Sequence, residues 1–397
     1  MGLRGDAAIV GIAELKPVRR PTDPGKFTLV QWAELARMAL DDAGISPHEV
    51  NGIVTASIAE SSSFVPSTVA EYLGAEVNFA EFVDLGGASA AGMVWRAASA
   101  IELGAADVVV CVAPSWPVPE PPGGRPGRGY LGASSGAYGS PQAEFDVPYG
   151  NLAQNCGYAM IANRYGYEYG YQPEALAKIS VDQRTNACAN PNAIFYGQPI
   201  TIADVLDSRM IADPLHLLEI VMPCSGGAAV VLAGRERAQR TKHRPVYVTG
   251  FGERVTYKTP TYARHLLDSP IKEAADQAFS MAGVQRSDID MISVYDCYTI
   301  TVLMTIEDAG FCPKGEGQRF VLDHDLTYRG DFPCNTHGGQ LGFGQPGLAG
   351  GMSHVTEGAR QIMGRAWDNQ MTRCDLAFVG GNGGIMSEQV GLIFQGA

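Results

Sequence analysis

The chain has 397 residues, of which 46% are hydrophobic and 18% are charged, and this composition excludes a disordered protein. Its formal net charge is -13 and it has no run rich in lysine and arginine, so we do not expect nucleic-acid binding. No apolar run reaches the roughly 20 residues of a membrane span. The eight cysteines include no C-x-x-C pair and no apolar leader opens the chain, so we expect no metal site and a reducing, cytoplasmic location.

The first part of the chain alternates between apolar strands and amphipathic helices. Residues 7–13 (AAIVGIA) predict a buried strand, and residues 29–43 predict a helix that ends at Gly44. The remaining predicted elements of this part are a strand at 51–55, a helix at 90–103 and a strand at 107–112. Alternation of strands and helices with short links is typical of an α/β sheet.

A long segment without regular periodicity follows. Residues 114–145 are rich in glycine and proline, and a stretch of this length is usually either a functional loop or disordered. Such a loop would cover either a bulky apolar substrate or a partner. Residues 151–168 and 173–190 are predicted helices, and residues 246–251 (VYVTGF) predict the first strand of a second α/β part.

An internal repeat relates the two parts. The segment Ala36–Val54 (ARMALDDAGISPHEVNGIV) aligns without a gap with Ala275–Ser293 (ADQAFSMAGVQRSDIDMIS), since 275 lies 239 positions after 36. Each copy has a helix that stops at Ala-Gly, an acidic linker and an apolar strand. A helix and strand within 90–112 resemble a second such pair within 350–380, which has a longer link. Two copies of one α/β unit predict a pseudo-twofold molecule.

Six segments carry a resemblance to a known family. They are AAIVGIAE near the start, VDLGGASAAG at 83–92, the segment at 190–219, VYDCYT at 294–299, EDAGFCPKGEG at 307–317 and CNTHGGQLGFGQPGLAGG at 334–351. The chain is thereby similar to the thiolase superfamily, in the branch of the sterol-carrier-type thiolases and lipid-transfer-protein-like proteins. The resemblance implies an α/β, thiolase-like fold, in which two duplicated βαβαβ halves form a five-layer α-β-α-β-α core, usually in a homodimer. It places the first half at 1–245, with a loop and insert region at about 114–210, and the second half at 246–397.

The positions that match the catalytic residues of a thiolase have changed. The nucleophilic cysteine of the family falls on Gly87, in the stretch GGASA. Ser89 is close, and it caps the helix, lines the pocket or, with a neighbouring base, acts as the nucleophile. The histidine of the family's G-H-P turn falls on Gln345, which can hydrogen-bond a thioester oxygen but cannot act as a base. The late cysteine and the fourth catalytic residue fall on Phe378 and Tyr295, so condensation through an acyl-enzyme is not expected.

The changed residues resemble those of the lipid-transfer-protein-like aldolases that act on steroid side chains. The shared features are the Tyr-Asp dipeptide at Tyr295 and the run NTHGGQLG at 335–342. The resemblance implies retro-aldol cleavage of a β-hydroxyacyl-CoA, in which a base removes the β-hydroxyl proton and hydrogen-bond donors stabilise the enolate. Tyr295 matches one catalytic tyrosine of those aldolases, and their second falls on Gln345. His337 is a further candidate catalytic residue, because the glycines after it allow backbone to approach a ligand, with a structural histidine as the alternative.

Tyr295 follows the apolar segment MISV, and α/β folds build their sites at the carboxyl ends of strands. Its phenol can donate a hydrogen bond or, at a lowered pKa, accept a proton; packing in the core is the alternative. Asp296 is expected to cap the following helix, with orientation of a neighbouring residue as the alternative, and Asn335 is expected to stabilise its own turn. The predicted substrate-binding residues are Gly87, Ser89, Asp296, Asn335, Gly338, Gly339 and Gly383.

The resemblance also concerns ligands and partners. It implies a CoA thioester as the substrate, no bound cofactor, and a small partner subunit with a zinc ribbon and an OB-like domain that helps to bind acyl-CoA. The candidates for contact with the CoA phosphates are Arg96, Arg125, Arg128 and Lys314, with a solvated surface position as the alternative for each. Three functions stay open: a carbon–carbon lyase on a CoA thioester, an acyltransferase with its nucleophile at Ser89 or a cysteine, and a catalytically silent acyl-CoA-binding subunit.

Overall fold

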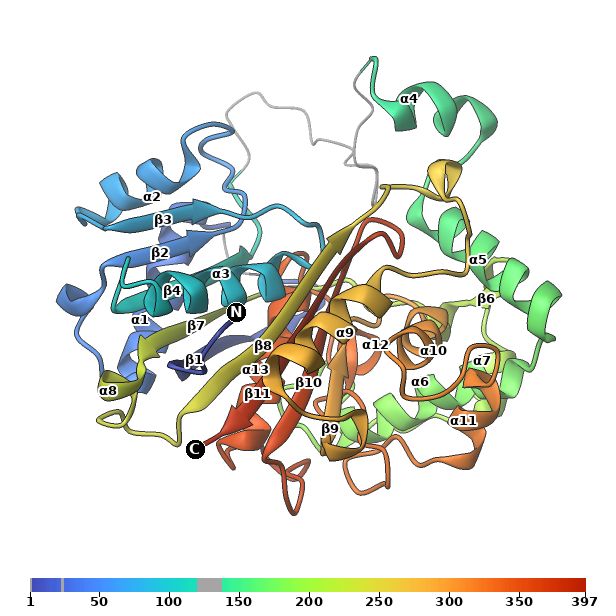
Figure 1. Ribbon diagram of the computed structural model, residues 1–397. Coiled ribbons are helices and arrows are strands. Elements are labelled where there is room, and N and C mark those ends of the chain that lie inside the picture. Colours follow the sequence, from blue (N-terminus) through green and yellow to red (C-terminus); the bar gives the residue numbers. More distant parts are fainter. Residues whose placement is uncertain (1, 23–24, 120–137) are drawn as a thin grey trace.

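The computed structural model describes residues 2–22, 25–119 and 138–397 (Figure 1). Arg125, Arg128 and much of the segment 114–145 lie outside these residues. The strands are β1 (Ala7–Val18), β2 (Gly52–Thr55), β3 (Phe79–Phe82), β4 (Val108–Ser115), β5 (Met210–Ala212), β6 (Leu215–His216), β7 (Ser225–Gly234), β8 (Val246–Val255), β9 (Met291–Val294), β10 (Leu376–Gly383) and β11 (Glu388–Gly396). The helices are α1 (Thr28–Ala43), α2 (Val65–Leu73), α3 (Ser89–Glu102), α4 (Pro141–Phe145), α5 (Gln154–Tyr169), α6 (Pro173–Cys188), α7 (Ile202–Leu206), α8 (Arg235–Ala238), α9 (Ile271–Ala282), α10 (Thr299–Asp308), α11 (Gly317–Asp323), α12 (Gly339–Gly342) and α13 (Ala349–Ile362).

Nine strands of the described residues form one mixed sheet, in the order β3-β2-β4-β7-β1-β8-β11-β10-β9. A short pairing of β1 with β8 joins its two halves, with Ala8 opposite Tyr247 and Ile9 opposite Val246. On one side of this junction β2 is parallel to β4, which is antiparallel to β7. On the other side β9 is parallel to β10, which is antiparallel to β11. The two half-sheets therefore share one topology, and β3 is an additional edge strand of the first.

The predicted internal repeat is present in the structure. An offset of 239 residues carries β2 onto β9 and the 3-10 turn at 47–49 onto the turn at 286–288. The helices before these turns, α1 and α9, both end at a glycine with a φ of 69°, Gly44 and Gly283. Only a residue that tolerates this left-handed conformation can end a helix in this way. The second pair is α3 and α13, each of 14 residues, and the link from α13 to β10 is the longer one.

The helices α3 and α13 form the central layer of the molecule (Figure 1). They pack against each other, and each also packs against β4, β7 and β10, which come from both half-sheets. The outer faces of the sheet are covered by α1, which packs on β1, β4 and β7, and by α9, which packs on β8 and β11. This order of layers is the five-layer arrangement expected for a thiolase-like fold.

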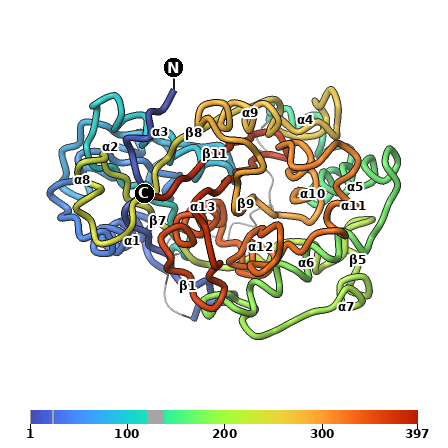
Figure 2. The backbone as a smooth tube through the Cα atoms, turned by 60° about the horizontal axis from the view of Figure 1, so that its bottom comes forward, coloured from blue at the N-terminus to red at the C-terminus, as the bar shows by residue number. Residues whose placement is uncertain are grey.

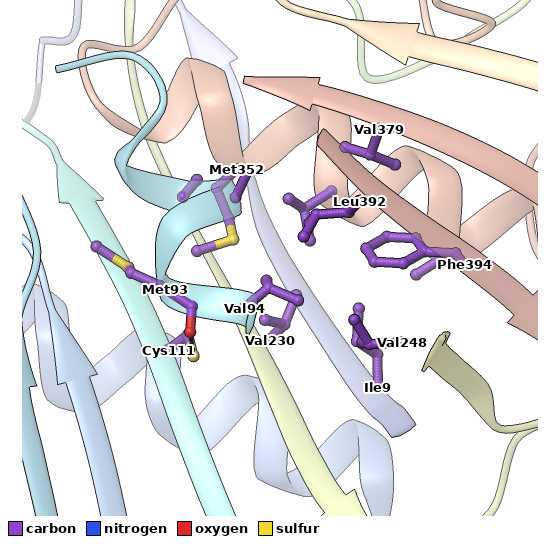
Figure 3. Close-up of a cluster of buried hydrophobic side chains, with 14 of the residues drawn as sticks. Ile9, Met93, Val94, Cys111, Val230, Val248, Met352, Val379, Leu392 and Phe394 are labelled. Carbon is purple, nitrogen blue, oxygen red and sulfur yellow. Dashed lines mark hydrogen bonds between the residues drawn. The ribbon is translucent and has the colours of Figure 1, made fainter. Parts of the chain in front are cut away.

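Figure 3 shows the core around the central layer. Met93 and Val94 of α3 and Met352 of α13 lie among side chains from the strands of both half-sheets. The labelled strand residues are Ile9, Cys111, Val230, Val248, Val379, Leu392 and Phe394, and each is at most 1% exposed. Burial of one large apolar side chain contributes roughly 1.5–3 kcal/mol, so this cluster is a major source of the contact between the halves.

The helices of the insert cover the second half of the chain (Figure 2). Both α5 and α6 pack against α10, and α6 also contacts α11 and α12. After the insert, the segment 220–224 runs between two segments of the second half. Ile220 forms a bridge with Tyr298, and Pro223 forms a bridge with Gln345. The segment 220–224 therefore holds together the chain that follows β9 and the glycine-rich chain that follows α12.

Membrane spans, disulfides and the division into domains concern the chain as a whole. Within the residues that the structure describes, no helix combines the length and apolar character needed to cross a membrane. All eight cysteines are free thiols. The strand β8 begins at Val246, while the division of the chain into domains at 245/246 stays a prediction.

Candidate active site

Tyr295 lies at the end of β9, in contact with residue 87. Its backbone N–H donates to the Gly380 carbonyl of β10 at 2.9 Å, and Tyr295 is 8% exposed. A Cβ atom on Gly87 would lie 2.4 Å from Cζ of Tyr295 and 2.4 Å from the carbonyl oxygen of Asn382. Real Cβ atoms do not approach other atoms so closely. The phenol ring thus occupies the space that a side chain on residue 87 would need.

The hydroxyl of Tyr295 keeps its proton at neutral pH. Burial raises the pKa of Tyr295, and the neighbouring Cys297 thiol raises it further. The side-chain amides of Gln345 and Gln340 lie close enough to the hydroxyl to lower this pKa in part. Because the net direction is upward, the phenol acts as a hydrogen-bond donor or acid, and the alternative in which it starts as a proton acceptor is not supported.

Gln345 lies beside Tyr295 on the glycine-rich loop between α12 and α13. Its backbone N–H donates to the Met222 carbonyl at 2.8 Å, and its carbonyl accepts from Cys224 N–H at 3.1 Å. Its side-chain Nε2 donates to the Gly347 carbonyl at 3.1 Å. A carboxamide can orient or polarise a neighbour but cannot take up a proton at neutral pH. Donation from Gln345 to a thioester oxygen stays a prediction.

Asp296 positions Gln340 next to the phenol. The carboxylate is fully buried, with Oδ1 accepting from Gln340 N–H at 2.8 Å and Oδ2 from Leu341 N–H at 3.2 Å. His354 of α13 places Nε2 3.1 Å from Asp296 Oδ1 and 3.3 Å from Gln340 Nε2. Asp296 therefore caps α12, and the prediction that it caps the helix directly after it, α10, is wrong. A cap between residues 44 positions apart arises from tertiary packing, which no local pattern reveals.

His337 lies in the protein interior next to His354. The ring centroid of His354 is 6.0 Å from that of Tyr295 and 5.1 Å from that of His337. His337 is fully buried, and neither ring nitrogen has a hydrogen-bond partner among the described residues. Burial lowers the pKa of His337 well below its usual range, and His354 and Arg360 lower it further, so the ring is neutral. Its assignment as a catalytic residue stays a prediction.

Asn335 stabilises the end of β9. Its Nδ2 donates to the Val294 carbonyl at 2.9 Å, and its Oδ1 accepts from Val294 N–H at 2.7 Å. The side chain therefore bonds to a strand 41 residues earlier in the chain, and the prediction that it stabilises its own turn is wrong. By holding Val294, Asn335 positions the backbone directly before Tyr295.

Three glycines predicted to bind substrate allow close packing of protein segments. A Cβ on Gly339 would lie 2.2 Å from Oδ2 of Asp296, and one on Gly338 would lie 2.6 Å from a side-chain atom of α6. A Cβ on Gly383 would lie 1.9 Å from the carbonyl oxygen of Leu85. Packing explains why glycine is present at these positions, and their contact with substrate stays a prediction.

Ser89 is the first residue of the central helix α3, and its hydroxyl both donates and accepts a hydrogen bond. Oγ donates to the Gly86 carbonyl at 2.7 Å and accepts from Leu85 N–H at 2.8 Å. Ser89 is 1% exposed. A carbonyl oxygen cannot act as a general base, so this geometry favours the interpretation that Ser89 closes the turn before the helix over the interpretation that it is a nucleophile.

Replacing Ser89 by alanine should therefore affect stability and leave catalysis intact. We expect the free energy of unfolding to fall by about 1–2 kcal/mol, because Leu85 N–H loses its partner. Turnover should change by less than about threefold. Denaturant unfolding and steady-state kinetics on S89A measure the two effects. A folded S89A protein that has lost all turnover would restore Ser89 as a candidate nucleophile.

The thiols near Tyr295 are not activated. Burial raises the pKa of Cys297 to about 12, and Asn382 Nδ2 lies 3.6 Å from its sulfur. Cys224, next to the Gln345 loop, likewise has its pKa raised to about 12 by burial. A nucleophilic cysteine needs a lowered pKa, because the thiolate is the reactive form. Neither thiol supports the acyltransferase alternative.

Two of the predicted phosphate ligands are neutralised within the protein. Arg96 forms ion pairs with Glu253 at 2.7 Å and with Glu81 at 2.9 Å. Lys314 forms an ion pair with Asp308 at 2.9 Å. Neither cation is therefore free for the CoA phosphates, and neither is a purely solvated group. The described residues contain no cluster of three or more histidine, cysteine, aspartate or glutamate side chains that could hold a metal ion.

Gln340 and His354 also lie in this site, although neither is among the residues predicted from the sequence. Gln340 lies within the run NTHGGQLG, but its position beside Tyr295 depends on Asp296. His354 belongs to α13, which the repeat pairs with α3, the helix that starts next to Gly87. A histidine on a helix predicted to lie in the central layer is therefore a signal that could have identified His354.

The chain is similar to known proteins over nearly its whole length. Residues 252–396 match the family described as thiolase C-terminal domain-like. A steroid side-chain-cleaving aldolase of Thermomonospora curvata is 35% identical over 373 residues, which are 91% of each protein. The 17-hydroxy-3-oxo-4-pregnene-20-carboxyl-CoA lyase of Mycobacterium tuberculosis is 33% identical over 368 residues, 91% of this chain and 92% of that protein. Among solved structures, an Ltp2-ChsH2(DUF35) aldolase has a TM-score of 0.86 at 33% identity, covering 99% of this chain and 98% of the other.

Proposed function

Because the chain belongs to the thiolase superfamily and matches carbon–carbon lyases of that superfamily over nine-tenths of its length, we propose that it cleaves a β-hydroxyacyl-CoA by a retro-aldol reaction. The names of the relatives support this class, since one is an aldolase and the other a CoA lyase. The observation that carries the proposal is the contact of Tyr295 with Gly87. A protonated phenol fills the space that a nucleophilic side chain would need, and this arrangement suits chemistry without an acyl-enzyme.

The proposed reaction breaks the bond between the α- and β-carbons of the thioester. The β-carbon becomes the carbonyl carbon of an aldehyde or ketone, and the electron pair of the broken bond passes to the thioester enolate. The proton lost from the β-hydroxyl is balanced by the proton gained at the α-carbon, so the reaction consumes no co-reactant. Tyr295 and Gln345 supply hydrogen-bond donors toward the enolate oxygen, and one such donor can contribute about 3 kcal/mol.

The relatives also support a substrate class and a partner. One is named for cleavage of steroid side chains and the other for a pregnene carboxyl-CoA, so the proposed substrate is a CoA-activated steroid side chain. The solved aldolase contains a DUF35 component. The proposed assembly is a homodimer that binds a small partner subunit of this kind, with a zinc ribbon and an OB-like domain. The eight free cysteines support a cytoplasmic location. The proposed reaction uses no bound cofactor.

Product analysis combined with intact-mass measurement tests the proposed function. The full chain, with and without a DUF35 partner, is incubated with a β-hydroxyacyl-CoA that carries a steroid side chain. We expect release of a ketone or aldehyde and of the shortened acyl-CoA, with the mass of the protein unchanged. A stable acyl adduct on the protein would favour the acyltransferase, and binding without turnover even with the partner would favour the silent subunit.

A further inference from the structure

One side of the helix α13 faces the candidate active site. Gly350, Gly351 and His354 of this helix are buried, and their spacing of three and four positions places them on the same side. A Cβ on Gly351 would lie 2.3 Å from the carbonyl oxygen of Gly87, the residue that contacts the Tyr295 ring. The side chain of His354 therefore enters the site from the turn that follows this close approach.

Gly350 makes room for two glutamine side chains. A Cβ on this residue would lie 2.7 Å from Gln340 Oε1 and 3.3 Å from Gln345 Cγ. Both amides lie close to the Tyr295 hydroxyl. Gln345 is half-buried, and its Nε2 donates to the Gly347 carbonyl of its own loop, whereas Gln340 is fully buried. The Gln340 amide therefore has to be held by the protein interior.

His354 contacts the Gln340 amide directly. Its Nε2 lies 3.3 Å from Gln340 Nε2, while Gln340 Oε1 has no hydrogen-bond partner among the described residues. A glutamine side chain has several rotatable bonds, and fixing them costs conformational entropy. Without the imidazole beside it, the amide would be free to turn away from the Tyr295 hydroxyl.

The imidazole of His354 is itself fixed through both nitrogens. Nδ1 lies 3.1 Å from the hydroxyl of Ser293, and Nε2 lies 3.1 Å from Asp296 Oδ1. Both partners are fully buried, and in the chain they stand on either side of Tyr295. Hydrogen bonds at both nitrogens set the orientation of a histidine ring. The ring is thus aligned by the same strand end that places the phenol.

We propose that His354 is a positioning residue, which holds the Gln340 amide against the hydroxyl of Tyr295. The inference rests on the proposed function, because it takes Tyr295 as a donor to the enolate oxygen. His354 touches no substrate in this role and acts through Gln340. A hydrogen bond that a phenol oxygen accepts polarises its O–H group, so a well-placed amide makes Tyr295 a stronger donor.

The variants H354N and H354Q test this role as a matched pair, since both replace the ring by an amide. The shorter H354N side chain reaches the position of Nδ1 beside Ser293, whereas that of H354Q reaches the position of Nε2 beside Gln340. We expect kcat to fall at least about tenfold in H354N, with KM changed by less than about twofold. H354Q should keep kcat within about threefold of the unchanged chain.

The same substitution in a second background distinguishes positioning from support of the fold. In Y295F/H354N, kcat should lie within about threefold of that of Y295F alone, because the hydroxyl through which His354 acts is absent. Equal losses from H354N in both backgrounds would overturn the inference. If H354N does not fold, H354F takes its place, since it keeps an aromatic ring and removes both nitrogens.

A histidine–aspartate contact away from Tyr295 provides the control. His243 Nε2 lies 3.3 Å from Oδ1 of Asp42, which belongs to α1 on the outer face of the first half-sheet. H243N removes a contact of the same kind and should leave kcat within about twofold of the unchanged chain. Thermal unfolding of each variant establishes that it is folded.

A measurement without turnover separates this inference from the proposed function. In protein labelled with ¹³C at the tyrosine ζ-carbon, the Tyr295 resonance is identified by its absence from Y295F. We expect this resonance to differ between H354N and H354Q, which both lack the ring, and to be unchanged in H243N. Identical resonances in H354N and H354Q would overturn the inference. A difference between them in a chain without lyase activity would reject the proposed function and leave the role of His354 toward Tyr295 intact.

Discussion

Replacing Tyr295 by phenylalanine should lower turnover of a β-hydroxyacyl-CoA by roughly 10²–10³-fold, the usual contribution of one hydrogen-bond donor to a developing oxyanion. Y295F keeps the ring that packs against Gly87 and loses only the hydroxyl. We therefore expect little change in the free energy of unfolding and in the affinity for CoA. Steady-state kinetics at saturating thioester, with CoA titration of the same preparation, separates loss of chemistry from loss of binding.

The control for Y295F is Y298F. Tyr298 is a buried neighbour whose hydroxyl donates to Asn155 Oδ1, and its removal should lower turnover by less than about fivefold. The pH profile gives a second readout. Because burial raises the Tyr295 pKa above its ordinary value of about 10, the contribution of its proton is present at neutral pH and is lost only as the pH rises through that raised pKa. Equal turnover in Y295F and the unchanged chain would remove Tyr295 from the mechanism.

Much of the fold could be predicted because its determinants are local and occur twice. The helices α1 and α9 end at Gly44 and Gly283 in the same left-handed conformation, and the same spacing then leads to β2 and β9. A helix period followed by a glycine stop and a short apolar run is visible in the sequence of either copy, and the repeat confirms both. The pairing of β1 with β8, which joins the two half-sheets, has no such local signal, because it depends on the contact of two strands far apart in the chain.

The site could be predicted only where a motif contains it. Tyr295 and Gln345 are candidates because they occupy positions that a resemblance marks, and in the structure the side-chain amide of Gln345 lies close to the Tyr295 hydroxyl. Their roles in catalysis stay predictions. Asp296 and Asn335 were given local roles, as a cap and a turn residue, whereas each bonds to backbone more than 40 residues away. Short polar side chains have many possible local hydrogen-bond partners. Sequence spacing does not reveal whether a distant backbone group will be the partner instead.

The close contact of Gly87 with Tyr295 shows how both half-sheets contribute to one candidate site. Gly87 belongs to the first half and precedes α3, while Tyr295 follows β9 of the second half. The close approach of the two depends on the packing of α3 against β10, where the Asn382 carbonyl also faces residue 87. A side chain at residue 87 and the ring of Tyr295 would therefore occupy the same space in this structure. A change at either residue affects which side chain the other position can hold.

Replacing Gly87 by alanine should consequently affect both stability and catalysis. The added Cβ would lie 2.4 Å from Cζ of Tyr295, so the ring has to move. Overpacking of a tight interior typically costs about 1–3 kcal/mol, and displacement of a catalytic group by about 1 Å can cost about 100-fold in rate. We expect the free energy of unfolding to fall by about 1–3 kcal/mol and turnover to fall at least about 100-fold. Denaturant unfolding measures the first effect, and release of ketone or aldehyde measures the second.

The control for G87A is G234A, because a Cβ on Gly234 would lie at an ordinary distance of 3.5 Å from its nearest neighbour. It should leave turnover within about twofold of the unchanged chain. The double variant G87A/Y295A then tests the pair itself. Removal of the ring relieves its contact with the new Cβ, so the double variant should be more stable than the sum of the two single losses predicts. Strict additivity of G87A and Y295A would show that the ring does not determine which residue position 87 can hold.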